Sequence, residues 1–470
     1  MGLFCVILGL LAWVLWQWNE VWLVKPLLRD GVNLPPGHLG LPFFGEMLNF
    51  LWYFKIIRRP DEFIYSRKKR YGAQVGMYRS HLFGSPTIIV SDPTANKFVL
   101  QSDDLFEKHW PHPELVGANA LVMAEGKLHK RLRKFVIDAL NQPRSLRHVI
   151  LKVQPRIVDA LRHWASKGII KAEHEARRVT FENICHMFAS FEPGPFLEEL
   201  ERCYSGVVAG IRSQPSNIPG SAYQHAFNCK KKLSKAFAIE LEKRKKNGSK
   251  SEDFLDALMN SCDEDGNHLQ EKEVLDNIFS LLLGAYESTA ISIMWALYYL
   301  SKSPHCLQRL REEHIEISKK KNGDYITIED IRLMKYTSKV VEETIRLGNV
   351  SSVVFRIARQ DVDFKGYRIP KGWKVSVWLR TLHVDPNNFD DPLNFNPDRW
   401  DTSMKPYTYQ VFGLGARICP GNMLARTQLS VFLHHLCLGY KWELVNPNAK
   451  ISYLPHPRPV DGAQLKFSAI

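Results

Sequence analysis

The sequence predicts a mainly helical fold with small β-sheets, preceded by one N-terminal transmembrane helix. Helical periodicity dominates residues 61–347. Short stretches at residues 74–78, 87–90 and 373–379 carry the residue types and alternation of β-strands. The first 19 residues contain no charged side chain, which is typical of a segment that enters a membrane.

Composition excludes several classes of protein. The chain has 470 residues, of which 45% are hydrophobic and 24% charged, so it can bury a large core and is not a disordered, collagen-like or coiled-coil protein. Its eight cysteines are scattered without a Cys-x-x-Cys motif, which indicates neither a disulfide scaffold nor a zinc ribbon. The net charge of +14 is compatible with nucleic acid, an anionic membrane or an acidic protein. Because no nucleic-acid-binding motif accompanies the basic runs, we expect no nucleic-acid partner.

Residues 1–24 are expected to form a transmembrane anchor. At about 1.5 Å per residue, a helix of this length covers the roughly 30 Å of membrane hydrocarbon. A cleavable signal peptide is the alternative, but the segment has neither a basic start nor a small-residue cleavage site. Its end is rich in rings suited to a membrane interface, namely Trp13, Trp16, Trp18 and Trp22. The basic residues that follow, from Lys25 onward, place the bulk of the chain on the cytosolic side.

Residues 25–45 form a proline-rich arm, which precedes one domain at residues 46–470. Prolines fix φ and cannot continue a helix, so the arm is stiff. It could be a plain linker or a rigid arm that orients the domain against a bilayer, and the sequence alone leaves both alternatives open. Within the domain, residues 243–251 and 261–267 are polar and are expected to be loops. Long helices are expected at residues 271–300 and 422–438.

The segment at residues 412–421 is a glycine-spaced loop with one cysteine, Cys419, directly before a helix. Backbone amides and the positive end of that helix would favour a thiolate. A thiolate bound to haem iron pushes electron density toward O–O cleavage. The spacing Phe-x-x-Gly-x-Arg-x-Cys-x-Gly resembles the signature of the haem-thiolate monooxygenases, the cytochromes P450. This resemblance implies the cytochrome P450 fold, haem b (iron protoporphyrin IX) as cofactor, and Cys419 as the axial ligand of its iron.

A second segment with this resemblance lies inside the predicted helix at residues 271–300. It is similar to the family's oxygen-activation turn, in which an acid followed by an alcohol delivers protons. The resemblance assigns the acid to Glu287 and the alcohol to Ser288, with Thr289 beside it. Two departures are visible, since Ala285 replaces the usual second glycine and Ser288 the usual threonine. Serine keeps the hydroxyl but lacks the methyl group that restricts χ1, so proton delivery would be less ordered.

The resemblance also implies two groups of residues outside the reacting centre. Glu343 and Arg346 match the family's buried Glu-x-x-Arg pair, which Arg399 joins to hold the irregular segment before the cysteine loop. Donors to the haem propionates are expected in a second group. It comprises Arg356, Arg417 and, where the family usually shows Trp-x-x-x-Arg, His129 and Arg133.

Several phrases narrow the resemblance to plant terpenoid oxidases that act on ent-kaurenoic acid or on triterpenoids. They include residues 216–223, 366–373 and 454–461. This branch implies a single-pass protein of the endoplasmic reticulum membrane with a cytosolic catalytic domain. It also implies contact with membrane lipid, a small apolar terpenoid substrate, and electrons from NADPH through NADPH-cytochrome P450 reductase.

The substrate is expected to be a neutral, triterpenoid-like molecule. By family analogy, residues 110–125, 209–219 and 350–354 line the distal pocket, and Arg212 is the basic side chain among them. A carboxylate-bearing diterpenoid would gain from a charged partner. The alternative substrate is ent-kaurenoic acid. A haem-thiolate isomerase or dehydratase that does not insert oxygen is the alternative class.

Overall fold

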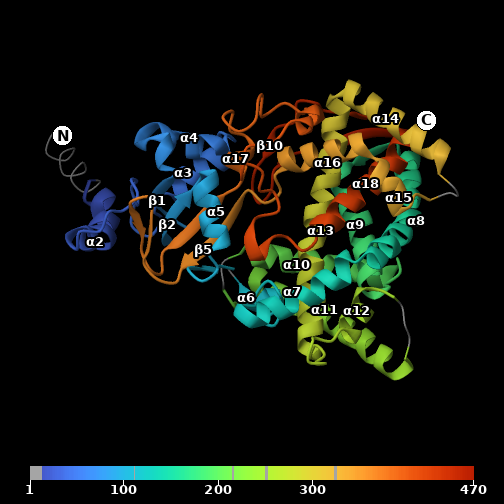
Figure 1. The fold of residues 1–470 in the computed structure, drawn as a ribbon, viewed down its shortest axis with the longest axis horizontal. Coiled ribbons are helices and arrows are strands. Elements are labelled where there is room, and N and C mark those ends of the chain that lie inside the picture. Colours follow the sequence, from blue (N-terminus) through green and yellow to red (C-terminus); the bar gives the residue numbers. More distant parts are fainter. Residues whose placement is uncertain (1–12, 111, 214–215, 249–251, 322–324) are drawn as a thin grey trace.

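A computed structural model describes residues 13–110, 112–213, 216–248, 252–321 and 325–470 of the chain. Helices make up most of it, and the larger sheet lies on the N-terminal side (Figure 1). The α-helices of the described residues are α2 (Lys25–Arg29), α3 (Met47–Leu51), α4 (Pro60–Tyr71), α5 (Pro93–Gln101), α6 (Pro113–Val116), α7 (Gly126–Asn141), α8 (Pro143–Lys167), α9 (Ala172–Ala189), α10 (Pro195–Ile211), α11 (Ala222–Asn247), α12 (Phe254–Asn260), α13 (Glu271–Lys302), α14 (Pro304–Lys320), α15 (Ile328–Leu333), α16 (Lys335–Gly348), α17 (Arg380–His383) and α18 (Asn422–Gly439). Short 3-10 or π segments are η1 (Glu20–Val24), η2 (Trp52–Ile56), η3 (Ala73–Val75), η4 (Pro397–Asp401) and η5 (Gly415–Arg417).

The strands form one five-stranded sheet and three smaller sheets. They are β1 (Met77–Leu82), β2 (Ser85–Val90), β3 (Phe106–Lys108), β4 (Ile169–Lys171), β5 (Val353–Ala358), β6 (Val362–Phe364), β7 (Tyr367–Ile369), β8 (Lys374–Trp378), β9 (Tyr440–Leu444), β10 (Ile451–Ser452), β11 (Arg458–Pro459) and β12 (Gln464–Ala469). The large sheet has the order β1-β2-β8-β5-β3, with β2 and β8 parallel and the other neighbours antiparallel. The predicted strands at residues 87–90 and 373–379 are confirmed by β2 and β8. The predicted strand at residues 74–78 is wrong in its first part, because Ala73–Val75 form η3 and Gly76, at φ +65°, turns the chain before β1 begins at Met77.

Helix α13 is the central element of the core. It packs against α9, α16 and α18, and most of its side chains from Tyr286 to Leu300 are buried (Figure 1). Among the described residues, α13 is the one helix long and apolar enough to cross a membrane, but 67% of its apolar window is buried inside the fold. A helix that is apolar on all sides is stable in the core of a large domain. The predictions of long helices at residues 271–300 and 422–438 are confirmed by α13 and α18.

The predicted loop at residues 243–251 is wrong in its first half. Helix α11 continues to Asn247, and its last turn carries Arg244, Lys245 and Lys246, whose charges interact favourably with the negative end of the helix dipole. Arg244 is buried and donates to Asp253, with Nη1 to Oδ1 at 2.6 Å. A basic run that resembles a solvated loop in the sequence therefore contains one arginine of the core.

The proline-rich arm is packed firmly on the domain. Residues 1–12 of the predicted anchor lie outside the described residues, and the chain is helical from residue 13 to Arg29. The Leu39 amide donates to Glu20 Oε1 at 2.8 Å, and Glu20 pairs with Arg79 at 3.3 Å. A Cβ atom on Gly37, at φ +153°, would lie 2.1 Å from the Arg79 carbonyl oxygen, so only glycine fits there. These contacts favour the rigid-arm alternative over a plain linker.

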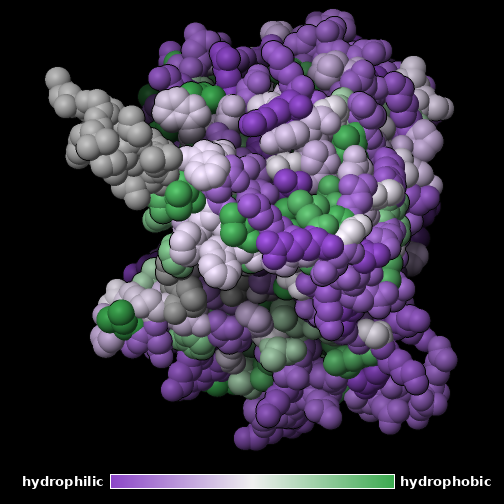
Figure 2. All heavy atoms as spheres, turned by 90° about the vertical axis from the view of Figure 1, so that its left-hand side faces the viewer, coloured by the Kyte–Doolittle hydropathy of each residue, from purple (hydrophilic) through white to green (hydrophobic). Residues whose placement is uncertain are grey.

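Large apolar side chains remain exposed on the N-terminal part of the chain. Figure 2 views the molecule from that side and shows apolar patches within a mainly hydrophilic surface. The exposed residues include Trp13, Trp16, Trp18, Trp22, Phe43, Phe44, Leu48, Trp52 and Ile56. Such a concentration of exposed aromatic and aliphatic side chains is typical of a surface that contacts lipid or another protein.

Glu343 and Arg346 form a fully buried ion pair on α16, as expected. Both side chains are 0% exposed, and Arg346 donates to Glu343 through Nε at 2.8 Å and Nη2 at 2.7 Å. Arg399 Nε joins them at 3.0 Å, and Trp400 Nε1 donates to the same carboxylate at 3.2 Å. The remaining Arg346 nitrogen, Nη1, donates to the His383 carbonyl at 2.6 Å. The pair therefore fastens α16 to the irregular segment that leads to Cys419.

Replacing Glu343 with alanine is expected to lower the free energy of unfolding by about 3 to 5 kcal/mol, because Arg346 would stay buried without a counter-charge. Urea unfolding followed by tryptophan fluorescence measures this loss. Asp398→Ala is the matched control, since Asp398 pairs with Arg309 on the surface and should cost at most about 1 kcal/mol. Equal losses in the two variants would contradict this structural role for Glu343.

Candidate active site

The cysteine loop is held in place by its own backbone. The Cys419 amide donates to the Phe412 carbonyl at 2.9 Å, and Asn422 Nδ2 donates to the Cys419 carbonyl at 2.7 Å. Gly415 has φ +74°, and a Cβ there would lie 2.6 Å from the Leu100 carbonyl oxygen. Glycine at this position therefore lets the loop pass close to α5.

The loop alone does not favour a thiolate. Burial raises the pKa of the Cys419 thiol, and the opposing effects of the Gly421 amide, Arg133 and Arg426 are smaller. The Gly421 amide favours the thiolate, as expected, but burial outweighs this effect in the protein without iron. Since a thiol that binds a metal ion is deprotonated, the iron itself would supply the missing positive charge.

The four predicted propionate donors come together from three elements. His129 and Arg133 lie one turn apart on α7, Arg356 lies on β5, and Arg417 lies in η5. Arg417 acts electrostatically on each of the other three, and Arg133 also interacts with Cys419. Residues separated by almost 300 positions in the sequence thus form one cationic cluster beside the cysteine.

This cluster fits an anionic group. Burial, with Arg417 and Arg133, lowers the pKa of His129 to about 4, so the imidazole is neutral and keeps one N–H donor. Burial and Arg417 also lower the pKa of Arg356, whose buried Nε has no hydrogen-bond partner. Asp103 is a nearby carboxylate and pairs with Arg417 at 3.3 Å. Positive charge therefore exceeds negative charge here, as a site for two propionates requires.

The predicted oxygen-activation segment leaves one face of α13 partly open. Gly284 is exposed, and a Cβ added to it would meet no atom within 4 Å. Ser288 lies on the same face and donates to the Gly284 carbonyl at 2.8 Å, whereas Thr289 is buried. Helix α13 continues through this segment without interruption. The Ser288 hydroxyl shares the Gly284 carbonyl with the helix backbone and does not break the helix.

Glu287 points away from that open face into a set of cations. Arg177 Nη2 of α9 lies 3.0 Å from Oε1, Arg212 contacts Oε2, and His456 Nε2 lies 3.2 Å from Oε2. Although burial raises the pKa of Glu287, His456, Arg212 and Arg177 together lower it to about 2. Sequence reasoning missed Arg177 and His456, which lie 110 and 169 positions from Glu287 and share no motif with it.

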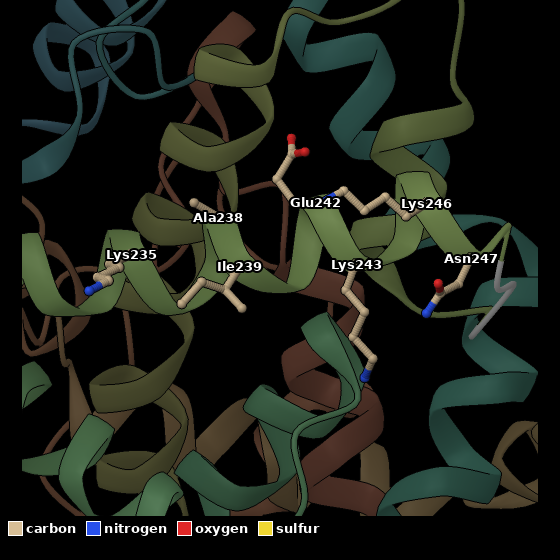
Figure 3. A pocket seen from close by; sticks show the side chains of 7 residues that line it. All are labelled: Lys235, Ala238, Ile239, Glu242, Lys243, Lys246 and Asn247. Atoms are coloured by element: carbon tan, nitrogen blue, oxygen red, sulfur yellow. The ribbon is translucent and has the colours of Figure 1, made fainter.

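A surface hollow elsewhere does not belong to this site. It measures about 510 Å³ and follows one face of α11 (Figure 3). Its lining residues are Lys235, Ala238, Ile239, Glu242, Lys243, Lys246 and Asn247. None of the predicted site residues lines it, and a hollow bounded by a single mostly exposed helix face cannot enclose a cofactor.

Comparison with known proteins decides the family. The sequence profile described as Cytochrome P450 matches residues 35–457. The chain belongs to the cytochrome P450 family. The solved structure of a retinoic acid-bound cyanobacterial cytochrome P450 superposes with a TM-score of 0.83 at 27% identity, covering 93% of this chain and 100% of the other. The expected cytochrome P450 fold is thereby confirmed.

Curated relatives are plant oxidases. Ent-kaurenoic acid oxidase 1 of Arabidopsis thaliana is 38% identical, covering 97% of this chain and 95% of its own length. The 7,8-epoxymelianol synthase of Ailanthus altissima is 36% identical, covering 99% of this chain and 95% of its own length. The beta-amyrin 11-oxidase of Glycyrrhiza uralensis is 32% identical, covering 94% of this chain and 92% of its own length. This cytochrome P450 is therefore a monooxygenase with haem b as cofactor, supplied with electrons from NADPH through a reductase. The alternative of an isomerase or dehydratase has no counterpart among these relatives.

Cys419→Ala is expected to abolish the red-shifted absorption of the reduced, carbon monoxide-treated protein, because that shift requires a thiolate on iron. Absorption spectroscopy and haem content measure the effect. Cys262→Ser is the matched control, since Cys262 is exposed, and it should retain the wild-type spectrum. A wild-type spectrum from Cys419→Ala would exclude this residue as the ligand.

Glu287→Gln is expected to lower the free energy of unfolding by about 3 kcal/mol at pH 7, because the native pKa is about 2 against an ordinary value of 4.5. A depressed pKa stabilises the fold above the unfolded-state value. The difference between wild type and variant should therefore shrink as the pH falls below about 4.5. Thermal unfolding across this range measures it, and a difference independent of pH would contradict the ion-pair network.

Proposed function

We propose that this cytochrome P450 hydroxylates a neutral terpenoid, of triterpenoid type, at the cytosolic surface of the endoplasmic reticulum membrane. The terpenoid class is supported by the curated relatives, whose names include both diterpenoid and triterpenoid oxidases. Neutrality of the substrate is supported by the state of Arg212, the basic side chain of the predicted distal segments. Its charge is already matched by the Glu287 carboxylate.

Arg212 carries the argument on substrate charge. It lies directly after α10 and contacts Glu287 Oε2. A substrate carboxylate would have to compete with a carboxylate that is 10% exposed and held by three cationic or polar partners. A neutral triterpenoid needs no such partner, and its burial is driven by apolar area alone.

Attachment to the membrane is supported by two features. The described part of the predicted anchor is helical and exposes Trp13, Trp18 and Trp22. The arm and η2 also expose Phe43 and Trp52, and Figure 2 shows apolar patches on this side of the molecule. We propose residues 1–24 as a single-pass anchor, residues 25–45 as a rigid arm and residues 46–470 as the catalytic domain. An apolar substrate would then enter from the bilayer.

The proposed roles of the chain's residues follow from their placement. Bound haem supplies dioxygen activation, with Cys419 as the thiolate ligand and the cationic cluster on its propionates. His129, Arg133, Arg356 and Arg417 orient the group by binding these carboxylates. Ser288 presents its hydroxyl on the partly open face of α13 beside Gly284. Glu287 precedes Ser288 in the chain, and in this proposal its carboxylate must first take up a proton before it can deliver one toward the Ser288 hydroxyl.

Oxidation of ent-kaurenoic acid is the second candidate function. It is favoured by the relatives named ent-kaurenoic acid oxidase, which reach 38% identity over almost the whole chain. The difference from the 36% of the 7,8-epoxymelianol synthase is too small to decide between the two substrates.

The full-length chain, reconstituted with NADPH-cytochrome P450 reductase in lipid, should oxidise neutral triterpenoids. Ent-kaurenoic acid is expected to show a kcat/KM about 100-fold lower, because a carboxylate buried without a partner costs about 3 kcal/mol. Mass spectrometry of the products measures both reactions. The methyl ester of ent-kaurenoic acid is the matched control, since it separates charge from size. Conversion of the acid with no conversion of triterpenoids would overturn the proposed substrate class.

A further inference from the structure

The loop between β10 and β11 places an imidazole directly on the buried acid of α13. His456 Nε2 lies 3.2 Å from Glu287 Oε2, and its Nδ1 lies 2.8 Å from the Val350 carbonyl oxygen. The loop is fixed to α13, since Trp295 Nε1 donates to the Pro457 carbonyl at 3.1 Å. His456 therefore occupies a defined position and is not a mobile surface residue.

The partners of His456 determine where its protons can be. A carbonyl oxygen only accepts, so Nδ1 carries a proton toward Val350. Nε2 has two neighbours of opposite character, the Glu287 carboxylate at 3.2 Å and Arg212 Nη2 at 3.1 Å. A protonated Nε2 donates to Glu287, whereas an unprotonated Nε2 accepts from Arg212. Both protonation states of this nitrogen thus have a hydrogen-bond partner in the same geometry.

A reversible proton carrier needs two such states. It also needs access to water, and the His456 side chain is 23% exposed whereas that of Glu287 is 10% exposed. Glu287 by itself is a poor carrier, because its surrounding cations stabilise the ionised form. Glu287 can therefore pass protons on only if a neighbouring side chain delivers each proton to it.

We propose that His456 is a positioning residue that relays protons from solvent to Glu287 during dioxygen activation. This inference rests on the proposed role of Glu287 and deepens it. The proton leaves Nε2 of the imidazolium and binds Oε2 of the carboxylate, and no electron is transferred. Neutral Nε2 then accepts from Arg212 until water returns a proton to it. Glu287 passes the proton on toward Ser288.

The charges around the relay come from every element packed on it. Helix α9 contributes Arg177 and Glu173, which lie 3.1 Å apart, and α10 ends at Arg212. Strand β11 contributes Arg458, which pairs with Glu173 at 2.7 Å and not with Glu287. Proton delivery in the wild type should therefore decrease as the pH rises, because the relay takes its protons from solvent.

The test uses the full chain with NADPH-cytochrome P450 reductase in lipid and needs no substrate. Reduction of dioxygen to water consumes two NADPH per O₂, and release of hydrogen peroxide consumes one. In the wild type the NADPH:O₂ ratio should fall as the pH rises.

In His456→Gln, the amide still donates to Glu287 but cannot exchange a proton. This variant should form water about tenfold more slowly, independently of pH. His163→Gln, an exposed histidine on α8, is the control and should behave as wild type.

A second measurement does not depend on turnover. Infrared titration of the ferric resting enzyme, with isotopically labelled histidine, should show an imidazolium signal that is coupled to a carboxylate band. Both signals should be lost in His456→Gln and in His456→Asn. Wild-type NADPH:O₂ ratios and pH dependence in His456→Gln, or an unchanged infrared titration in the variants, would overturn the relay. Failure to oxidise any terpenoid would overturn only the proposed substrate class, because neither measurement uses a terpenoid.

Discussion

The buried carboxylate of Glu343 is the constraint on which the cysteine loop depends. It accepts from Arg346, Arg399 and Trp400 and from the Asn396 amide at 3.0 Å, so one acid on α16 gathers donors from residues 396–400. Residues 381–412 have little secondary structure of their own and would otherwise pay a large entropic cost to stay ordered. Because the buried Glu343 carboxylate must keep its hydrogen-bond donors, residues 381–412 have one low-energy conformation. This conformation fixes where the cysteine loop with Cys419 begins.

The charge environments of Cys419 and of Glu287 differ. Around Cys419 the cations exceed the anions, and a buried Arg356 nitrogen lacks a partner, so the cluster is completed by an anionic cofactor. Around Glu287 each charged side chain already has a partner of opposite charge within the protein. Arg212 belongs to this second environment, which explains why a basic side chain in a substrate-facing segment does not imply an acidic substrate.

The departures from the family pattern are compatible with the chemistry. His129 replaces a tryptophan but is buried, neutral and still a donor, so it could donate to a propionate. Ser288 replaces a threonine and retains a hydroxyl on the open face, where its bond to the Gly284 carbonyl orients it without a methyl group. The helix keeps its regular form at this turn. Proton supply therefore depends on side chains around Glu287 more than on a distortion of the backbone.

The sequence by itself determined the long helices, the strands β2 and β8, the cysteine loop and the Glu343, Arg346 and Arg399 set. Periodicity and fixed spacing are local properties, and these elements are local or belong to a known motif. Only the tertiary structure placed Arg177 and His456 on Glu287, because each comes from a distant element and carries no motif. It also turned the first half of a predicted loop into the end of α11, where Arg244 is buried. Burial and partner identity arise when distant segments pack together, and no window of sequence contains that information.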